Sequence, residues 1–153
     1  MKSLIPMRFD LDNKVAIVTG ASQGIGETIA VEMASSGAYV ICLARNKNAL
    51  DSTIDIIKKN GKQAIAYSCD ITNNDQFNHI IKSVIDEHGK IDILVNNAGI
   101  TNDTLLMRMS DEQWDNVLNI NLKGSFTSTR SVIKHMMKKR FGRIINILSL
   151  IHI

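Results

Sequence analysis

The residues best suited to chemistry form a glycine-rich turn near the start of the chain. Val15–Val18 are consecutive apolar residues, which predicts a strand buried on both faces of a parallel sheet. Directly after them come Thr19-Gly20-Ala21-Ser22-Gln23-Gly24-Ile25-Gly26. Gly20 permits a tight turn, Gly24 lets backbone approach a pyrophosphate, and Gly26 lets the next helix pack closely. This spacing indicates a dinucleotide-binding turn, although an ordinary turn between strand and helix has the same residues.

Small or polar residues also stand where the other strands are expected to end. In open α/β sheets, ligands bind outside the carboxyl ends of the strands, so we expect these positions to converge on one site. The residues expected to emerge there are Thr19, Ala44, Asp70, Asn97 and Ser149. Asp70 has an alternative role as a cap at the end of its strand.

The residue after the second expected strand bears on the choice of nucleotide. NAD enzymes place an acid there, where it bonds the ribose 2′-hydroxyl. This chain has Ala44 followed by Arg45, whose planar guanidinium suits a 2′-phosphate. The pattern favours NADPH over NADH. A solvated charge at the start of a helix is the alternative reading of Arg45.

Strands and helices alternate along the chain, which predicts an α/β fold with a doubly wound parallel sheet. We expect strands at 14–19, 38–43, 64–68, 91–95 and 143–148. We expect helices at 24–36, at about 48–59, around the apolar stripe of 77–85, and from about 110 to 140 with a break near 121–124. Gly37, Gly61 and Gly89 stand just past three of the expected helix ends, where a left-handed residue is favoured.

Ordered motifs along nearly the whole chain resemble the short-chain dehydrogenase/reductase family. The matching segments are Thr19–Gly26, Asp70, Asn96–Gly99, Asn119–Gly124 and Gly142–Ser149. The resemblance implies a Rossmann-type doubly wound sheet that is incomplete, with about five of the family's usual seven strands. Within the family, Gly99–Phe126 looks most like the 3-oxoacyl-(acyl-carrier-protein) reductases.

The resemblance also implies a role for individual residues. Asn121 resembles the residue that anchors a water and helps place a catalytic lysine, although a polar kink in a helix is the alternative. Ser149 resembles the catalytic serine that bonds the substrate carbonyl. Gln23 departs from the second basic residue that NADPH-dependent members often carry. The implied nucleotide-binding residues are Thr19, Gly20, Ser22, Gln23, Gly24, Ile25, Gly26, Arg45, Asp70, Ile71, Asn97, Ala98 and Gly99.

The function that this resemblance implies is reduction of a 3-oxoacyl thioester by NADPH in fatty-acid synthesis. The family forms homotetramers, and the partner would be an acidic acyl-carrier protein. Lys138, Lys139 and Arg140 are expected to steer it from beside the active-site entrance, unless they only complement a helix dipole. The alternatives are a short-chain reductase of another small ketone or sugar and a non-catalytic nucleotide-binding module.

The family's Tyr-x-x-x-Lys pair, which supplies the proton, has no counterpart here. The only tyrosines are Tyr39 and Tyr67, and neither is followed by lysine four places on. We therefore expect a C-terminally truncated chain that is inactive as a reductase. Leu148–Ile153 departs from the family and is a direct translation of CTGTCTCTTATACACATC, a transposon end used in DNA library preparation. We expect a lead-in at 1–12, an NAD(P)-binding domain at 13–147 and a non-native tail at 148–153, in which Ser149 matches the catalytic position by coincidence or partial overlap. A truncated gene is the alternative.

Composition excludes several other classes of protein. A chain of 153 residues with 44% hydrophobic content can bury one substantial core. The net charge of +3 is too small to indicate a nucleic-acid partner. No apolar run reaches the roughly 20 residues that span a bilayer, and 1–12 is charged where a signal peptide is apolar, so we expect a cytoplasmic protein and no membrane partner. The histidines are scattered, and Cys42 and Cys69, in and directly after expected strands, are expected to be small buried apolar residues, so we predict no metal site.

Overall fold

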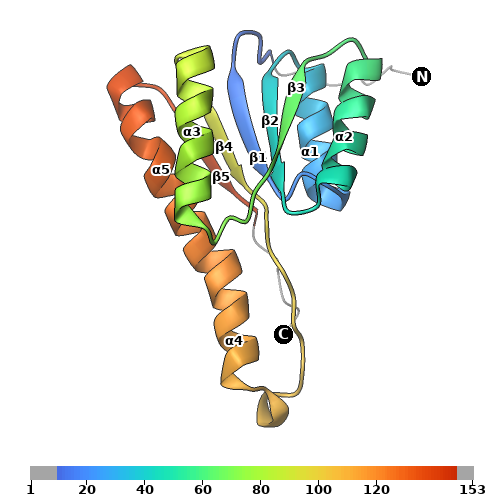
Figure 1. Ribbon diagram of the computed structural model, residues 1–153, viewed down its shortest axis with the longest axis vertical. Helices are drawn as coiled ribbons and strands as arrows, with labels where there is room; N and C mark the ends of the chain where they lie inside the picture. Colours follow the sequence, from blue (N-terminus) through green and yellow to red (C-terminus); the bar gives the residue numbers. More distant parts are fainter. Residues whose placement is uncertain (1–9, 148–153) are drawn as a thin grey trace, which may run out of the picture.

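The computed structural model describes residues 10–147 and contains one five-stranded parallel sheet (Figure 1). The strands are β1 (Val15–Thr19), β2 (Tyr39–Ala44), β3 (Ala64–Ser68), β4 (Ile93–Asn96) and β5 (Arg143–Asn146). Their order across the sheet is β3-β2-β1-β4-β5, and every neighbouring pair is parallel. The predicted α/β sheet is confirmed, with strand bounds that differ from the expected ones by at most two residues.

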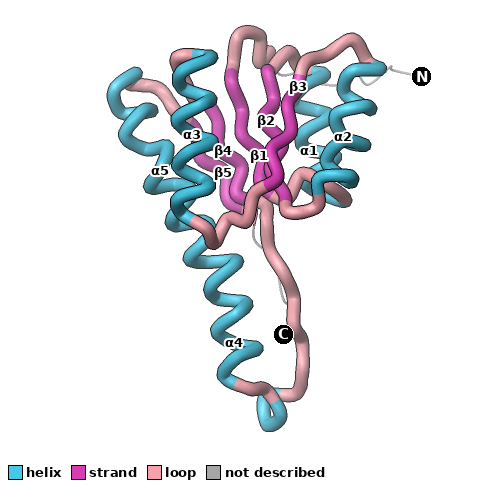
Figure 2. Tube along the Cα trace, viewed as in Figure 1, coloured by secondary structure: helices cyan, strands magenta, loops and turns pink. Residues whose placement is uncertain are grey.

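Helices cover both faces of this sheet, as Figures 1 and 2 show. Helices α1 (Gly24–Ser35) and α2 (Lys47–Lys59) lie on one face, and α3 (Asn74–His88) and α5 (Gly124–Lys139) lie on the other. Each face of the sheet packs its own hydrophobic core. Ala16 and Val18 of β1 belong to the core beneath α1 and α2, and Val15 and Ile17 belong to the core beneath α3 and α5. This two-sided burial explains why the strand reads as an unbroken apolar run.

Local signals in the sequence fix the ends of the helices. The side chains of Asn46 and Asn73 accept hydrogen bonds from the first turns of α2 and α3, and Ser110 forms a capping box with Gln113. The three glycines expected past helix ends all have positive φ: they are Gly37 (104°), Gly61 (69°) and Gly89 (71°).

The long helix expected from 110 to 140 differs from the prediction in its middle. It contains α4 (Asp111–Val117), a π-helical segment η2 (Leu118–Lys123) and α5, and it is continuous instead of broken. A short 3₁₀ helix, η1 (Leu106–Arg108), precedes it and was not expected. Helix α4 projects beyond the carboxyl edge of the sheet (Figure 1).

Candidate functional site

A cleft of about 600 Å³ opens at the carboxyl edge of the sheet. It lies at the ends of β1 and β4, the adjacent strands between which the chain reverses its order across the sheet, and open α/β sheets bind ligands at such a point. All the expected nucleotide-binding residues except Thr19 line it. The lining residues are Gly20, Ser22, Gln23, Gly24, Ile25, Gly26, Ala44, Arg45, Asn46, Ala49, Cys69, Asp70, Ile71, Asn97, Ala98, Gly99, Ile100 and Ile120.

Thr19 is buried behind the cleft and joins the ends of β1 and β4. Its hydroxyl donates to the Val95 carbonyl (3.2 Å) and accepts from the backbone N–H groups of Asn97 and Ala98 (3.0 Å each). In return, the Asn97 amide donates to the Thr19 carbonyl (3.0 Å) and lies 3.3 Å from the Gly20 carbonyl. Thr19 thus positions the cleft and is not one of its lining residues.

The turn between β1 and α1 needs glycine for close packing and leaves an open concavity. Gly20 has a φ of +67°, and a Cβ there would lie 2.9 Å from the Ala98 Cα. A Cβ on Gly26 would overlap the Gly20 carbonyl oxygen. Gly24, by contrast, has open space around it.

Helix α1 presents its amino terminus to this concavity. Its N-cap residue, Gln23, makes no side-chain capping bond, so the N–H groups of the first turn are not capped by it. Uncapped N–H groups at a helix start bind anions, and here they line a cleft. The turn therefore fits the pyrophosphate of a dinucleotide.

Asp70 and Arg45 place opposite charges on the wall of the cleft formed after β2 and β3. The Asp70 Oδ1 accepts hydrogen bonds from the Thr72 hydroxyl (2.7 Å) and backbone N–H (2.9 Å). These bonds, and more weakly the charge of Arg45, hold the pKa of Asp70 below its ordinary value against the opposing effect of burial. Asp70 is therefore a carboxylate at neutral pH, and it caps a turn while also facing the cleft.

Asn121 lies in the π-helical segment and holds the loop after β4. Its side chain accepts from the Ile100 N–H and donates to the Ile100 carbonyl, both at 2.9 Å. The Ser125 hydroxyl, four residues on, donates to the Asn121 carbonyl at 2.7 Å. The side chain of Asn121 thus holds the backbone of Ile100, which lines the cleft, and it does so from a widened turn of the helix. Ser149 lies outside the described residues.

Several cleft residues were missed by the sequence analysis. Asn46, Ala49, Cys69, Ile100 and Ile120 line the cleft, and each lies within four residues of a motif residue that was identified. Cys69 and Cys42 are both buried, as expected, and burial raises their pKa values to about 11 and about 12. Both are therefore thiols at neutral pH and poor nucleophiles.

The basic cluster Lys138–Arg140 lies at the opposite edge of the sheet from the cleft. It ends α5, immediately before β5, whose first N–H (Arg143) bonds to the Asp92 carbonyl (2.9 Å) just before β4. Figure 1 shows this end of α5 beside the amino ends of the strands. The expectation that the cluster flanks the cleft is therefore wrong within one chain, because α5 runs antiparallel to the strands.

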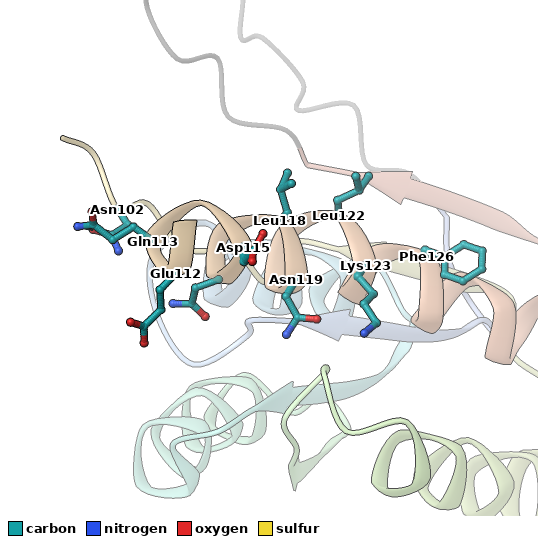
Figure 3. A pocket seen from close by; sticks show the side chains of 10 residues that line it. Asn102, Glu112, Gln113, Asp115, Leu118, Asn119, Leu122, Lys123 and Phe126 are labelled. Atoms are coloured by element: carbon teal, nitrogen blue, oxygen red, sulfur yellow. The ribbon is translucent and has the colours of Figure 1, made fainter. Parts of the chain in front are cut away.

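A second, larger hollow of about 1210 Å³ follows the outer surface of the long helix (Figure 3). Apart from Asn102, all its lining residues come from α4, η2 and the start of α5. Leu118 and Leu122 point to one side of the helix, whereas Asn119 and Lys123 point to the other (Figure 3). One helix surface does not enclose a small molecule, so we assign ligand binding to the smaller cleft.

Residues 10–147 show neither a metal centre nor a membrane-spanning helix. They contain no group of three or more His, Cys, Asp or Glu side chains that could hold a metal ion. Within the same span, no helix has the length and apolar character needed to cross a membrane.

Sequence relatives agree with this geometry. A profile described as short chain dehydrogenase matches residues 14–152. A 3-oxoacyl-(acyl-carrier-protein) reductase of Synechocystis is 46% identical over 140 residues, and one of Escherichia coli K12 is 42% identical over 142 residues. These matches cover 91% and 93% of this chain but 57% of each relative, so the chain spans little more than half their length.

Solved structures with the same fold belong to related proteins. A metagenomic short-chain oxidoreductase in complex with NADP has a TM-score of 0.88 and 36% identity, covering 94% of this chain and 65% of that one. The citronellol catabolism dehydrogenase of Pseudomonas aeruginosa has a TM-score of 0.85 and 34% identity, and the match covers 90% of this chain and 56% of that one.

The ionisation of Asp70 gives a test of the cleft wall. Thr72→Val removes the hydroxyl that contributes most to lowering the Asp70 pKa, so this pKa should rise toward its ordinary value. A carboxylate whose pKa is lower in the folded state stabilises the fold above its unfolded pKa, and this stabilisation is lost as the pH falls through the folded pKa. The variant should therefore lose less stability on acidification than the unmodified chain does.

Carbon NMR titration of the Asp70 carboxyl measures the pKa, and urea unfolding at neutral and acidic pH measures the stability. Thr104→Val, in an exposed loop, is the control. An Asp70 pKa that stays unchanged in Thr72→Val would contradict this account of the wall.

Proposed function

The chain belongs to the short-chain dehydrogenase family, and we propose that it is the nucleotide-binding part of an NADPH-dependent 3-oxoacyl-(acyl-carrier-protein) reductase of fatty-acid synthesis. The observation that carries the proposal is the cleft at the ends of β1 and β4, where a glycine turn, a helix amino terminus and Arg45 meet. The substrate comes from the relatives, whose names specify that reductase.

Different residues of the cleft would bind different parts of NADPH. The N–H groups of Gly24–Gly26 would receive the pyrophosphate, because anions bind at uncapped helix starts. The Arg45 guanidinium would pair with the 2′-phosphate, and the Asp70 carboxylate would accept from the adenine edge. Asn97–Gly99 would lie along the nucleotide. Bound NADPH supplies the hydride.

The reaction also needs groups that meet the substrate. We assign Ser149 to the substrate carbonyl, and Asn121 to fixing the loop at Ile100 beside the cleft. Tyr39 is unsuited to donate the proton. It is the first residue of β2, so it lies at the amino end of the strand, away from the cleft, and its pKa is raised, mainly by burial. Tyr67 lies within β3 and packs against the core. The proton donor is therefore expected in residues beyond this chain.

We further propose an acyl-carrier protein as the partner and a homotetramer as the assembly. The exposed apolar side chains along the long helix, Trp114, Leu118, Leu122 and Phe126, fit a surface that another protein covers. Lys138–Arg140 lie far from the cleft within one chain, which favours their role at the end of the α5 dipole over steering in the monomer.

A short-chain reductase of another small ketone is the second candidate. The observation in its favour is that the structural neighbours include a dehydrogenase of citronellol catabolism.

Nucleotide choice tests the role of Arg45. NADPH is expected to bind more tightly than NADH, and Arg45→Ala should remove about 1–3 kcal/mol of NADPH binding through loss of a charge-assisted contact. NADH binding should barely change. Calorimetric titration of both nucleotides measures this. Arg108→Ala, in η1 and not among the residues lining the cleft, is the matched control. Equal affinities for the two nucleotides in the unmodified chain would refute the proposed selectivity.

Catalysis tests the function itself. A version of the protein extended to the length of its relatives should oxidise NADPH in the presence of an acetoacetyl thioester. Chain 1–153 should bind NADPH without turnover, because no tyrosine stands among the described residues that line the cleft. Absorbance at the nicotinamide band follows the reaction. Turnover by chain 1–153, or none by the extended protein on this thioester, would contradict the proposal.

A further inference from the structure

One polar residue interrupts the apolar face of α2. Leu50, Ile54 and Ile57 form the buried stripe of this helix, and Thr53 belongs to the same stripe, with 0% of its surface exposed. The spacing i, i+3, i+4, i+7 would ordinarily place a fourth apolar residue there. A buried hydroxyl destabilises the fold unless it is hydrogen-bonded, so the hydrogen-bond acceptor of Thr53 indicates what this hydroxyl does.

The hydroxyl of Thr53 reaches the glycine-rich turn. It donates to the Ala21 carbonyl at 3.0 Å, and the alternative acceptor, the Ala49 carbonyl one turn earlier in α2, is more distant at 3.3 Å. The Ala21 N–H in turn donates to the Leu43 carbonyl of β2 at 3.1 Å. Ala21 is fully buried and is thus held through both of its backbone polar groups.

Ala21 separates two residues that line the cleft, Gly20 and Ser22. Because the Ala21 peptide is anchored behind the turn, its neighbours are held toward the cleft. The same helix, α2, contributes Ala49 to the lining of the cleft, and its cap residue Asn46 also lines it. The bond from Thr53 to Ala21 therefore joins two parts of the cleft lining, the glycine-rich turn and the start of α2.

We propose that Thr53 is a positioning residue for nucleotide binding, acting through the Ala21 carbonyl on the glycine-rich turn. This inference rests on the proposed function, because it requires that the cleft binds a nicotinamide dinucleotide. Thr53 itself does not line the cleft. The Thr53 hydroxyl acts on the turn that would hold the pyrophosphate, and NADPH and NADH share this group. Loss of the hydroxyl therefore lowers the affinity for both nucleotides by a similar factor. Arg45 instead distinguishes them.

The test compares variants at position 53 in chain 1–153. Thr53→Val keeps the volume but leaves the Ala21 carbonyl buried without its donor, and the affinities for NADPH and NADH should both fall about tenfold, by similar factors. Thr53→Ser keeps the hydroxyl and should restore both affinities to within about twofold. Ser52→Ala is the matched control, because it removes a hydroxyl of the same helix that bonds only to the Asn48 carbonyl (3.2 Å) and faces solvent.

Calorimetry measures the affinities, and circular dichroism confirms that each variant is folded at the assay temperature. If Thr53→Val is unfolded, Thr53→Cys replaces it: the thiol is a weaker donor than the hydroxyl, so the affinities for both nucleotides should fall, by less than in Thr53→Val. A folded variant with unchanged affinity, or a serine variant that fails to restore affinity, overturns this inference alone. Failure of the unmodified chain to bind either nucleotide overturns the proposed function, and the inference with it.

Discussion

The reciprocal hydrogen bonds between Thr19 and Asn97 are the contacts on which the cleft depends. β1 and β4 are adjacent in the sheet but far apart in sequence, and the chain departs from their ends in opposite directions. A buried hydroxyl and a side-chain amide fix these ends to each other through bonds of 3.0–3.2 Å. Without them the glycine turn and the segment after β4 would be independent loops. With them, the two loops form one concave surface.

The same solution recurs at the other walls of the cleft. Asn121 fixes the loop after β4 through the backbone of Ile100, and Thr53 fixes the glycine turn through the carbonyl of Ala21. In each case a side chain on a helix bonds to the backbone of a loop. These bonds occupy the backbone groups of Ile100 and Ala21, and they fix the neighbouring residues that line the cleft, which is how a loop site becomes preorganised.

The sequence predicted the fold well, because each strand between two helical layers must be apolar on both faces and each turn needs its glycine. Nearly all the nucleotide-binding residues that it named also line the cleft, since they belong to contiguous motifs at strand ends. It did not reveal features that depend on three-dimensional direction. Thr19 adjoins the motif but points inward, Lys138–Arg140 are close in sequence to β5 but lie at its amino end, and Thr53 is separated by 32 positions from the Ala21 carbonyl it serves. Periodicity on α2 could have identified Thr53 as buried, but not its partner.

The most direct test of the central claim is to map where NADPH binds on the chain. Nitrogen-15 NMR of chain 1–153 titrated with NADPH should shift the amide signals of Gly20, Ser22, Gly24 and Ala98, which line the cleft. The amides of Asn116 and Leu122, in the larger hollow along the helix surface, should stay in place. Shifts confined to that helix surface, with the amides of the glycine-rich turn unchanged, would contradict the account.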